Sequence, residues 1–109
     1  MKRIYISGPI TADPIGGTRQ AVHAAHTLRN HGYAPLVPHL TVIEAMICGD
    51  RPYADWLAAD LAWVAVSDAV VRLPGASPGA DREVAYALKH GIPVHLSVDE
   101  FLQEEGHRA

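Results

Sequence analysis

A segment rich in proline and glycine, which joins an apolar run to a helical one, most constrains the fold of this chain. Residues 69–73 are typical of a buried strand, and residues 84–90 are typical of a helix. The sequence Pro74-Gly75-Ala76-Ser77-Pro78-Gly79 between them predicts a loop. In an open α/β sheet, such a loop lies at the carboxyl edge of the strands, where ligands bind.

The same alternation continues along the rest of the chain. Strands are expected at residues 3–7, 33–37, 69–73 and 92–96, and the segments between them are helical, among them 19–30, 41–47, 53–66 and 79–90. Strands that alternate with helices form parallel sheets. Pro35 indicates that the second strand lies at an edge, since proline cannot donate to a ladder. We therefore expect one α/β domain over residues 1–109, with a parallel sheet of four or five strands in the order 2-1-3-4.

Composition narrows the class of protein. The chain has 109 residues and a formal charge of −3, with acidic and basic residues interspersed, so nucleic-acid binding is not indicated. Cys48 is the single cysteine, which is typical of a reducing compartment. The sequence has no signal peptide pattern, and no apolar run approaches the roughly 20 residues that span a membrane. These features predict a cytoplasmic protein without a membrane partner.

The chemistry-bearing residues follow the predicted strands. Glu83 falls in the first turn of the helix after the loop, beside groups suited to a phosphate, namely the Ser77 hydroxyl and the backbone N–H groups of Gly79 and Ala80. The alternative is that Glu83 only complements the helix dipole. Asp60 is flanked by apolar residues in its helix, which favours a role in a site over a solvent-facing position.

A second anion cradle is possible after the first strand. Its two halves, residues 7–9 and 16–19, are joined by the loop at residues 10–17. His39 follows the second strand at the same edge of the sheet. The candidate ligand-binding residues here are Ser7, Gly8, Gly17, Arg19 and His39. An ordinary glycine-rich loop is the alternative, because neither a P-loop nor a dinucleotide fingerprint is present. His23 and His26 lack partners at ligand spacing, so no metal site is predicted.

Three motifs together resemble one family. They are Tyr5-Ile6-Ser7-Gly8-Pro9, Asp60 ahead of Ser67-Asp68-Ala69-Val70-Val71-Arg72-Leu73-Pro74-Gly75, and Ser77-x-Gly79-Ala80-x-x-Glu83 followed by Gly91-Ile92-Pro93-Val94. This pattern is similar to the nucleoside 2-deoxyribosyltransferase superfamily. Within it, the chain resembles most the small bacterial and phage-type members and the 2′-deoxynucleoside 5′-monophosphate N-hydrolases.

The resemblance implies a flavodoxin-like three-layer sandwich and covalent catalysis without metal or organic cofactor. Glu83 takes the place of the nucleophile, Asp60 that of the acid at the leaving base, and Tyr5 that of the residue orienting the nucleophile. Ser77 stands where the transferases carry an Asp for the 5′-hydroxyl and the hydrolases a Ser for phosphate. Members often complete the site across subunits, so we expect a homodimer or larger assembly, packed through residues 53–66.

The functional prediction is therefore hydrolysis of the N-glycosidic bond of a nucleoside 5′-monophosphate, releasing free base and sugar phosphate. Base exchange between deoxynucleosides is the first alternative. A phosphoribohydrolase of the Lonely-Guy type ranks lower, because its glycine signature is denser than the one at residues 74–79. The alternative without catalysis is a nucleotide-sensing module that kept the pocket and lost turnover.

Overall fold

The computed structural model describes residues 1–10 and 13–108. Within them, four strands form one parallel sheet, namely β1 (Arg3–Ser7), β2 (Ala34–Leu36), β3 (Ala69–Arg72) and β4 (Val94–His95). The strand order is β2-β1-β3-β4, as expected, and β2 with its Pro35 lies at an edge. Both outer strands are shorter than predicted, and each contains or follows a proline that lacks an N–H.

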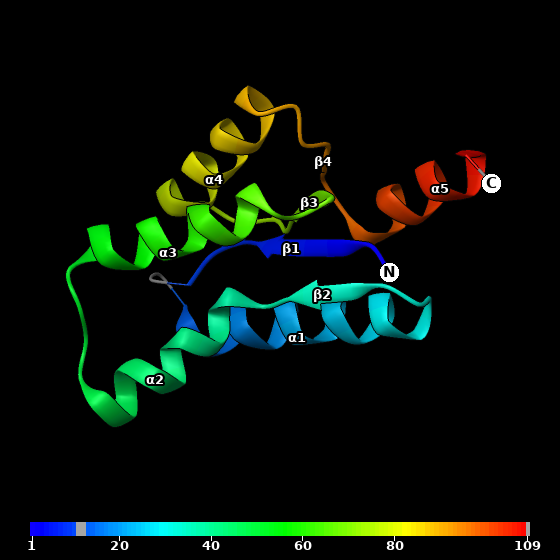
Figure 1. The fold of residues 1–109 in the computed structure, drawn as a ribbon. Coiled ribbons are helices and arrows are strands. Elements are labelled where there is room, and N and C mark those ends of the chain that lie inside the picture. The colour runs from blue at the N-terminus through cyan, green and yellow to red at the C-terminus, as the bar shows by residue number, and fades with distance from the viewer. Residues whose placement is uncertain (11–12, 109) are drawn as a thin grey trace.

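Helices cover both faces of this sheet, which confirms the three-layer architecture (Figure 1). On one face, α1 (Pro14–Asn30) and α5 (Val98–Arg108) pack against the sheet through Leu28 and Phe101. On the other face, α3 (Tyr53–Ala65) and α4 (Pro78–Lys89) pack through Val64 and Ala87. Alternate residues of β1 point to opposite faces, as strand geometry requires.

A third region projects beyond the sheet. After β2, the 3₁₀ turn η1 (Pro38–Leu40) leads directly into α2 (Thr41–Cys48), and a loop then returns to α3 (Figure 1). Although α2 is largely apolar, none of its residues is buried. No helix in the described ranges is both long and apolar enough to cross a membrane. The cytoplasmic location stays a prediction of the sequence.

The start of α1 differs from the prediction. The helix begins at Pro14 and not near Arg19, because Asp13 caps it by accepting the Gly16 N–H at 3.1 Å and proline suits the first helical turn. Gly17 therefore lies inside the helix. At this point the backbone of α1 lies so close to the backbone of Pro9 that a Cβ on Gly17 would be 2.1 Å from the Pro9 carbonyl oxygen.

Candidate functional site

The centre of the candidate site is built on β1. Ile4 and Ile6 face α1, so the alternation of the strand turns Tyr5 and Ser7 toward α3 and α4. Both of these polar side chains are fully buried at the carboxyl half of the central strand. A buried hydroxyl needs a hydrogen-bond partner, and both hydroxyls find the same one, the carboxylate of Glu83.

Glu83 is held by these two donors. The Tyr5 hydroxyl donates to Oε2 at 2.9 Å, and the Ser7 hydroxyl donates to Oε1 at 2.7 Å. Only 6% of Glu83 is exposed. Because α4 begins at Pro78, Glu83 lies in its second turn and not in the first, where Asp81 is the acidic residue. The geometry thus favours a functional carboxylate over simple complementation of the helix dipole.

Asp60 of α3 faces Glu83, and the two carboxyls influence each other. Burial, followed by the charge of Glu83 and a hydrogen bond to it, raises the pKa of Asp60 to about 7. Burial also raises the pKa of Glu83, but the hydrogen bonds from Ser7 and Tyr5 oppose this. A hydrogen bond between two carboxyls requires one proton. Since Glu83 has the two hydroxyl donors, the proton belongs on Asp60 and the charge on Glu83.

Tyr5 keeps its proton across the physiological range. Burial, followed by the electrostatic influence of the Glu83 and Asp60 carboxyl groups, raises the pKa of its hydroxyl far above the ordinary value. It is therefore a permanent donor to Glu83. Such a donor fixes the orientation of the carboxylate without competing for the proton of Asp60.

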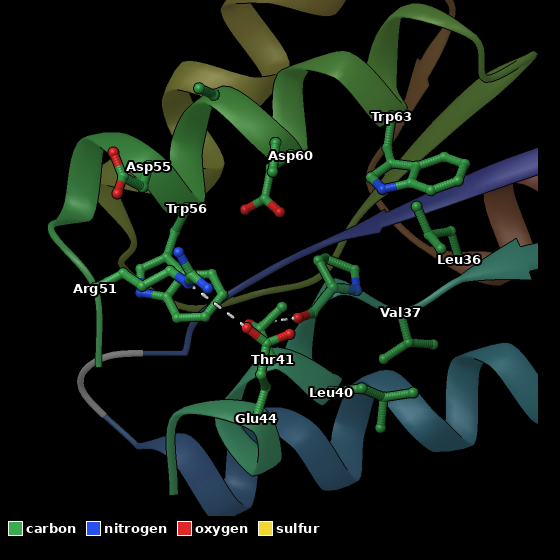
Figure 2. Close-up of a pocket in the computed structure, with 13 residues that line it drawn as sticks. Leu36, Val37, Leu40, Thr41, Glu44, Arg51, Asp55, Trp56, Asp60 and Trp63 are labelled. Carbon is green, nitrogen blue, oxygen red and sulfur yellow. Dashed lines mark hydrogen bonds and ion pairs between the residues drawn. The ribbon is translucent and has the colours of Figure 1, made fainter. Parts of the chain in front are cut away.

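Two cavities open beside this cluster. The larger, about 880 Å³, is lined by Glu83 and Asp60 together with Gly8, Ser77, Gly79 and Ala80. The smaller, about 660 Å³, lies between α3 and the segment from β2 to α2, and Asp60 points into it between Trp56 and Trp63 (Figure 2). Because Asp60 lines both cavities, the middle part of a ligand that spans them would contact the Asp60 carboxyl.

The loop after β3 brings the predicted phosphate-binding residues to the larger cavity. Ser77 caps α4, and its Oγ accepts the Ala80 N–H at 3.1 Å. The hydroxyl proton of Ser77 remains available to a ligand. The Ala80 N–H is thus engaged by the cap and is not free for a phosphate. Arg82, whose guanidinium lies 5.4 Å over the Tyr53 ring, adds positive charge to the same cavity wall.

Of the described residues of the second proposed cradle, Gly8 lines the larger cavity and Ser7 lies beside Glu83. Arg19 is exposed on α1, Gly17 is buried against Pro9, and neither lines either of these two cavities. The early start of α1 is the reason, because it makes the predicted loop residues helical. Thr11 and Ala12 of the loop expected at residues 10–17 lie outside the described residues.

His39 is buried and does not line either cavity. Burial lowers the pKa of its ring, while the backbone of Gly8 and Pro9 opposes the shift, so the ring is neutral. Neither ring nitrogen completes a hydrogen bond within the described residues. Since a Cβ on Gly8 would lie 3.6 Å from Nε2, His39 backs the wall of the cavity at Gly8.

Sequence reasoning missed a polar network at the mouth of the cavities. The Trp56 indole donates to Asp50 Oδ1 at 2.8 Å. The Arg51 guanidinium lies 6.0 Å from the centre of the Trp56 ring and 3.7 Å from the Glu44 carboxylate (Figure 2). The clustering of opposite charges around a tryptophan in residues 44–56 is the only signal that the sequence offered for this network.

Comparison with known proteins places the chain in a family. A family model described as a domain of unknown function, DUF4406, matches residues 2–96. The chain belongs to the DUF4406 family. No curated protein matches the chain.

Solved structures confirm the fold that the resemblance implied. A 2-desoxiribosyltransferase from Leishmania mexicana matches with a TM-score of 0.65 and 19% identity, over 86% of this chain and 62% of that one. A 2-deoxyribosyltransferase from the psychrotolerant bacterium Bacillus psychrosaccharolyticus matches with a TM-score of 0.62 and 17% identity, over 84% of this chain and 69% of that one. This chain thus spans less than two thirds of the Leishmania structure, and at such identities the likeness concerns the fold.

Proposed function

We propose that this protein is an enzyme that cleaves the N-glycosidic bond of a nucleoside 5′-monophosphate. One observation carries the proposal: a buried carboxylate, Glu83, is fixed by two hydroxyl donors, faces a carboxyl whose pKa is about 7, and opens on a cavity. Enzymes that cleave glycosidic bonds usually carry two carboxyl groups, one protonated and one ionised.

The first step forms a bond between a Glu83 oxygen and C1′ of the sugar while the bond from C1′ to the base breaks. The electron pair of that bond goes to the base nitrogen, and the proton of Asp60 goes to the departing base. Positive charge develops at C1′ in the transition state, and the ionised Glu83 stabilises it. The Tyr5 and Ser7 hydroxyls hold the carboxylate in place for this attack.

The second step regenerates the enzyme. A water molecule attacks C1′, its proton returns to the Asp60 carboxylate, and the ester bond between C1′ and Glu83 breaks. The products are the free base and the sugar 5-phosphate. If a second base attacks in place of water, the same intermediate gives base exchange. That alternative is favoured by the fold shared with the two deoxyribosyltransferases.

The preference for a monophosphate rests on Ser77 and the beginning of α4. The Ser77 hydroxyl proton, the positive end of the helix and Arg82 all lie at the larger cavity. A carboxylate at residue 77 would repel a phosphate and would instead accept a hydrogen bond from a free 5′-hydroxyl. Serine therefore supports the phosphorylated substrate.

Incubation with a panel of ribo- and deoxynucleotides and their nucleosides, followed by chromatography for free base, tests the proposal. We expect base release by the wild type and its near-complete loss in Glu83→Gln, with ligand binding retained. Glu104→Gln, which changes an exposed carboxyl on α5, is the matched control. Binding of nucleotides without base release would support the sensing module and overturn the enzymatic proposal.

We also propose that the protein is a homodimer or larger assembly packed through α3. Trp63 is 55% exposed, and the neighbouring α2 leaves Met46 and Ile47 about three-quarters exposed. Trp56 differs in that it is half-buried and lines both cavities, whereas the more exposed Trp63 lines only the smaller one. An apolar surface of this kind is typical of an interface between proteins.

A further inference from the structure

Arg72 is a charged residue in an otherwise apolar strand. In the parallel register of β1 and β3, Ser7 pairs with Arg72, just as Tyr5 pairs with Val70. Paired residues of neighbouring strands share a face of the sheet, so Arg72 lies on the face that carries Tyr5 and Ser7. A largely buried charge is costly unless it is paired and hydrogen-bonded, and the side chain of Arg72 is only 13% exposed.

Its guanidinium meets three acceptors on the chain that follows β3. Nη1 donates to the Leu73 carbonyl, and Nη2 donates to the Gly75 carbonyl at 2.9 Å and to Asp81 Oδ1 at 3.2 Å. Gly75 and Asp81 lie on either side of Ser77 in the sequence. Arg72 therefore binds the loop before Ser77 and the helical turn after it.

Gly75 strengthens this attachment. Its φ of +117° suits only glycine, and a Cβ there would lie 2.6 Å from Cγ of Pro9. The loop is thus packed against the end of β1 as well as bonded to Arg72. Arg72 itself lines neither cavity, so its effect on a ligand must pass through these contacts.

We propose that Arg72 is a positioning residue, which holds the segment carrying Ser77 and Glu83 in register with β1 and β3. This inference rests on the proposed function, since it assigns Ser77 to the substrate and Glu83 to the reacting carbon. The planar guanidinium fork is suited to several acceptors at once, whereas a lysine ammonium is a single point charge.

The charge of Arg72 also acts on Glu83. Several groups face this carboxyl: Tyr5 and Ser7 from β1, Asp60 from α3 and Arg72 from β3, while Asp81 and Arg82 adjoin it on α4. Of these, Arg72 supplies the positive charge that lowers the pKa of Glu83 against the effect of burial. Loss of that charge favours the protonated acid, which cannot attack C1′.

Two variants separate the effect of the positive charge of Arg72 from that of the hydrogen bonds made by its planar guanidinium group. In Arg72→Met, the pKa of Glu83, read from the carboxyl ¹³C shift of labelled glutamate and assigned with Glu83→Gln, should rise above its value in the wild type. The acid limb of kcat/KM for base release should move to higher pH by the same amount. In Arg72→Lys, the Glu83 pKa should stay close to its value in the wild type, while KM for the monophosphate rises several-fold. Arg29→Met, at an exposed arginine on α1, is the control.

An unchanged Glu83 pKa in folded Arg72→Met, or an unchanged monophosphate KM in Arg72→Lys, would overturn the proposal. If Arg72→Met does not fold, the Arg72→Lys result decides. The ¹³C titration needs no turnover, so it remains informative if the wild type releases no base. That outcome would count against the proposed function, and the titration would still decide the electrostatic role of Arg72.

Discussion

Replacing Asp60 with asparagine should stabilise the protein in neutral and alkaline solution. Asparagine has nearly the shape of a protonated aspartate but never becomes charged. In the folded protein the pKa of Asp60 is about 7, against an ordinary value of 3.8. Between these values the folded state binds more protons at Asp60 than the unfolded state does, so the contribution of Asp60 to the stability of the wild type falls as the pH rises.

The magnitude follows from the same two values. The whole shift corresponds to about 4 kcal/mol, at about 1.4 kcal/mol for each pKa unit. Asp60 is only partly buried and lines two cavities, so solvent screens part of this cost. We therefore expect Asp60→Asn to be more stable than the wild type by about 1–2 kcal/mol at pH 8, with little difference at pH 4.

Urea denaturation at pH values from 4 to 8 measures this directly. Asp55→Asn, which removes an exposed carboxyl from the same helix, is the control. The stability of Asp60→Asn relative to the wild type should increase between pH 4 and pH 8. Equal stabilities at pH 8, or a difference between the two proteins that does not grow as the pH rises, would refute the assignment of the proton to Asp60. Base release should fall about 10²–10⁴-fold in the same variant, because the general acid is lost.

Three further changes test other parts of the account. Ser77→Asp should reduce or reverse the preference in kcat/KM for a monophosphate over its nucleoside, and a wild type that already prefers the nucleoside would make the protein a base-exchange transferase. Light scattering at micromolar concentration should report a dimer or larger assembly, and a charge at the exposed Trp63 should dissociate it; a monomeric wild type would reject the interface. Gly17→Ala should lower the midpoint of thermal unfolding by several degrees, since its Cβ would lie 2.1 Å from the Pro9 oxygen, and an unchanged midpoint would show that α1 moves freely.

Local patterns in the sequence were sufficient for the layers and the order of the strands. The apolar run before Pro74 and the alternation of strand and helix define the parallel sheet, and Pro35 correctly marks an edge. The start of α1 was missed because Gly16 and Gly17 look like loop residues. The structure keeps them in a helix, since Asp13 and Pro14 initiate it and Gly17 permits close contact with Pro9.

The candidate site was likewise predictable from the sequence only in part. Glu83, Asp60 and Tyr5 were predicted together, and the structure brings them together. Ser7 and Glu83 lie 76 positions apart in the chain. Their contact depends on how α4 packs over β1, which no local sequence pattern encodes. The burial of His39 and the exposure of Arg19 likewise depend on packing between elements distant in sequence.

Mass spectrometry of the protein mixed rapidly with a 2′-deoxynucleoside 5′-monophosphate that it cleaves tests the central claim most directly. The account predicts an adduct with the mass of the deoxyribosyl phosphate group on the peptide that contains Glu83, and its absence from Glu83→Gln. An analogue that slows the second step would increase its yield. Release of base by Glu83→Gln at the rate of the wild type, or an adduct on another residue, would contradict the covalent role of Glu83.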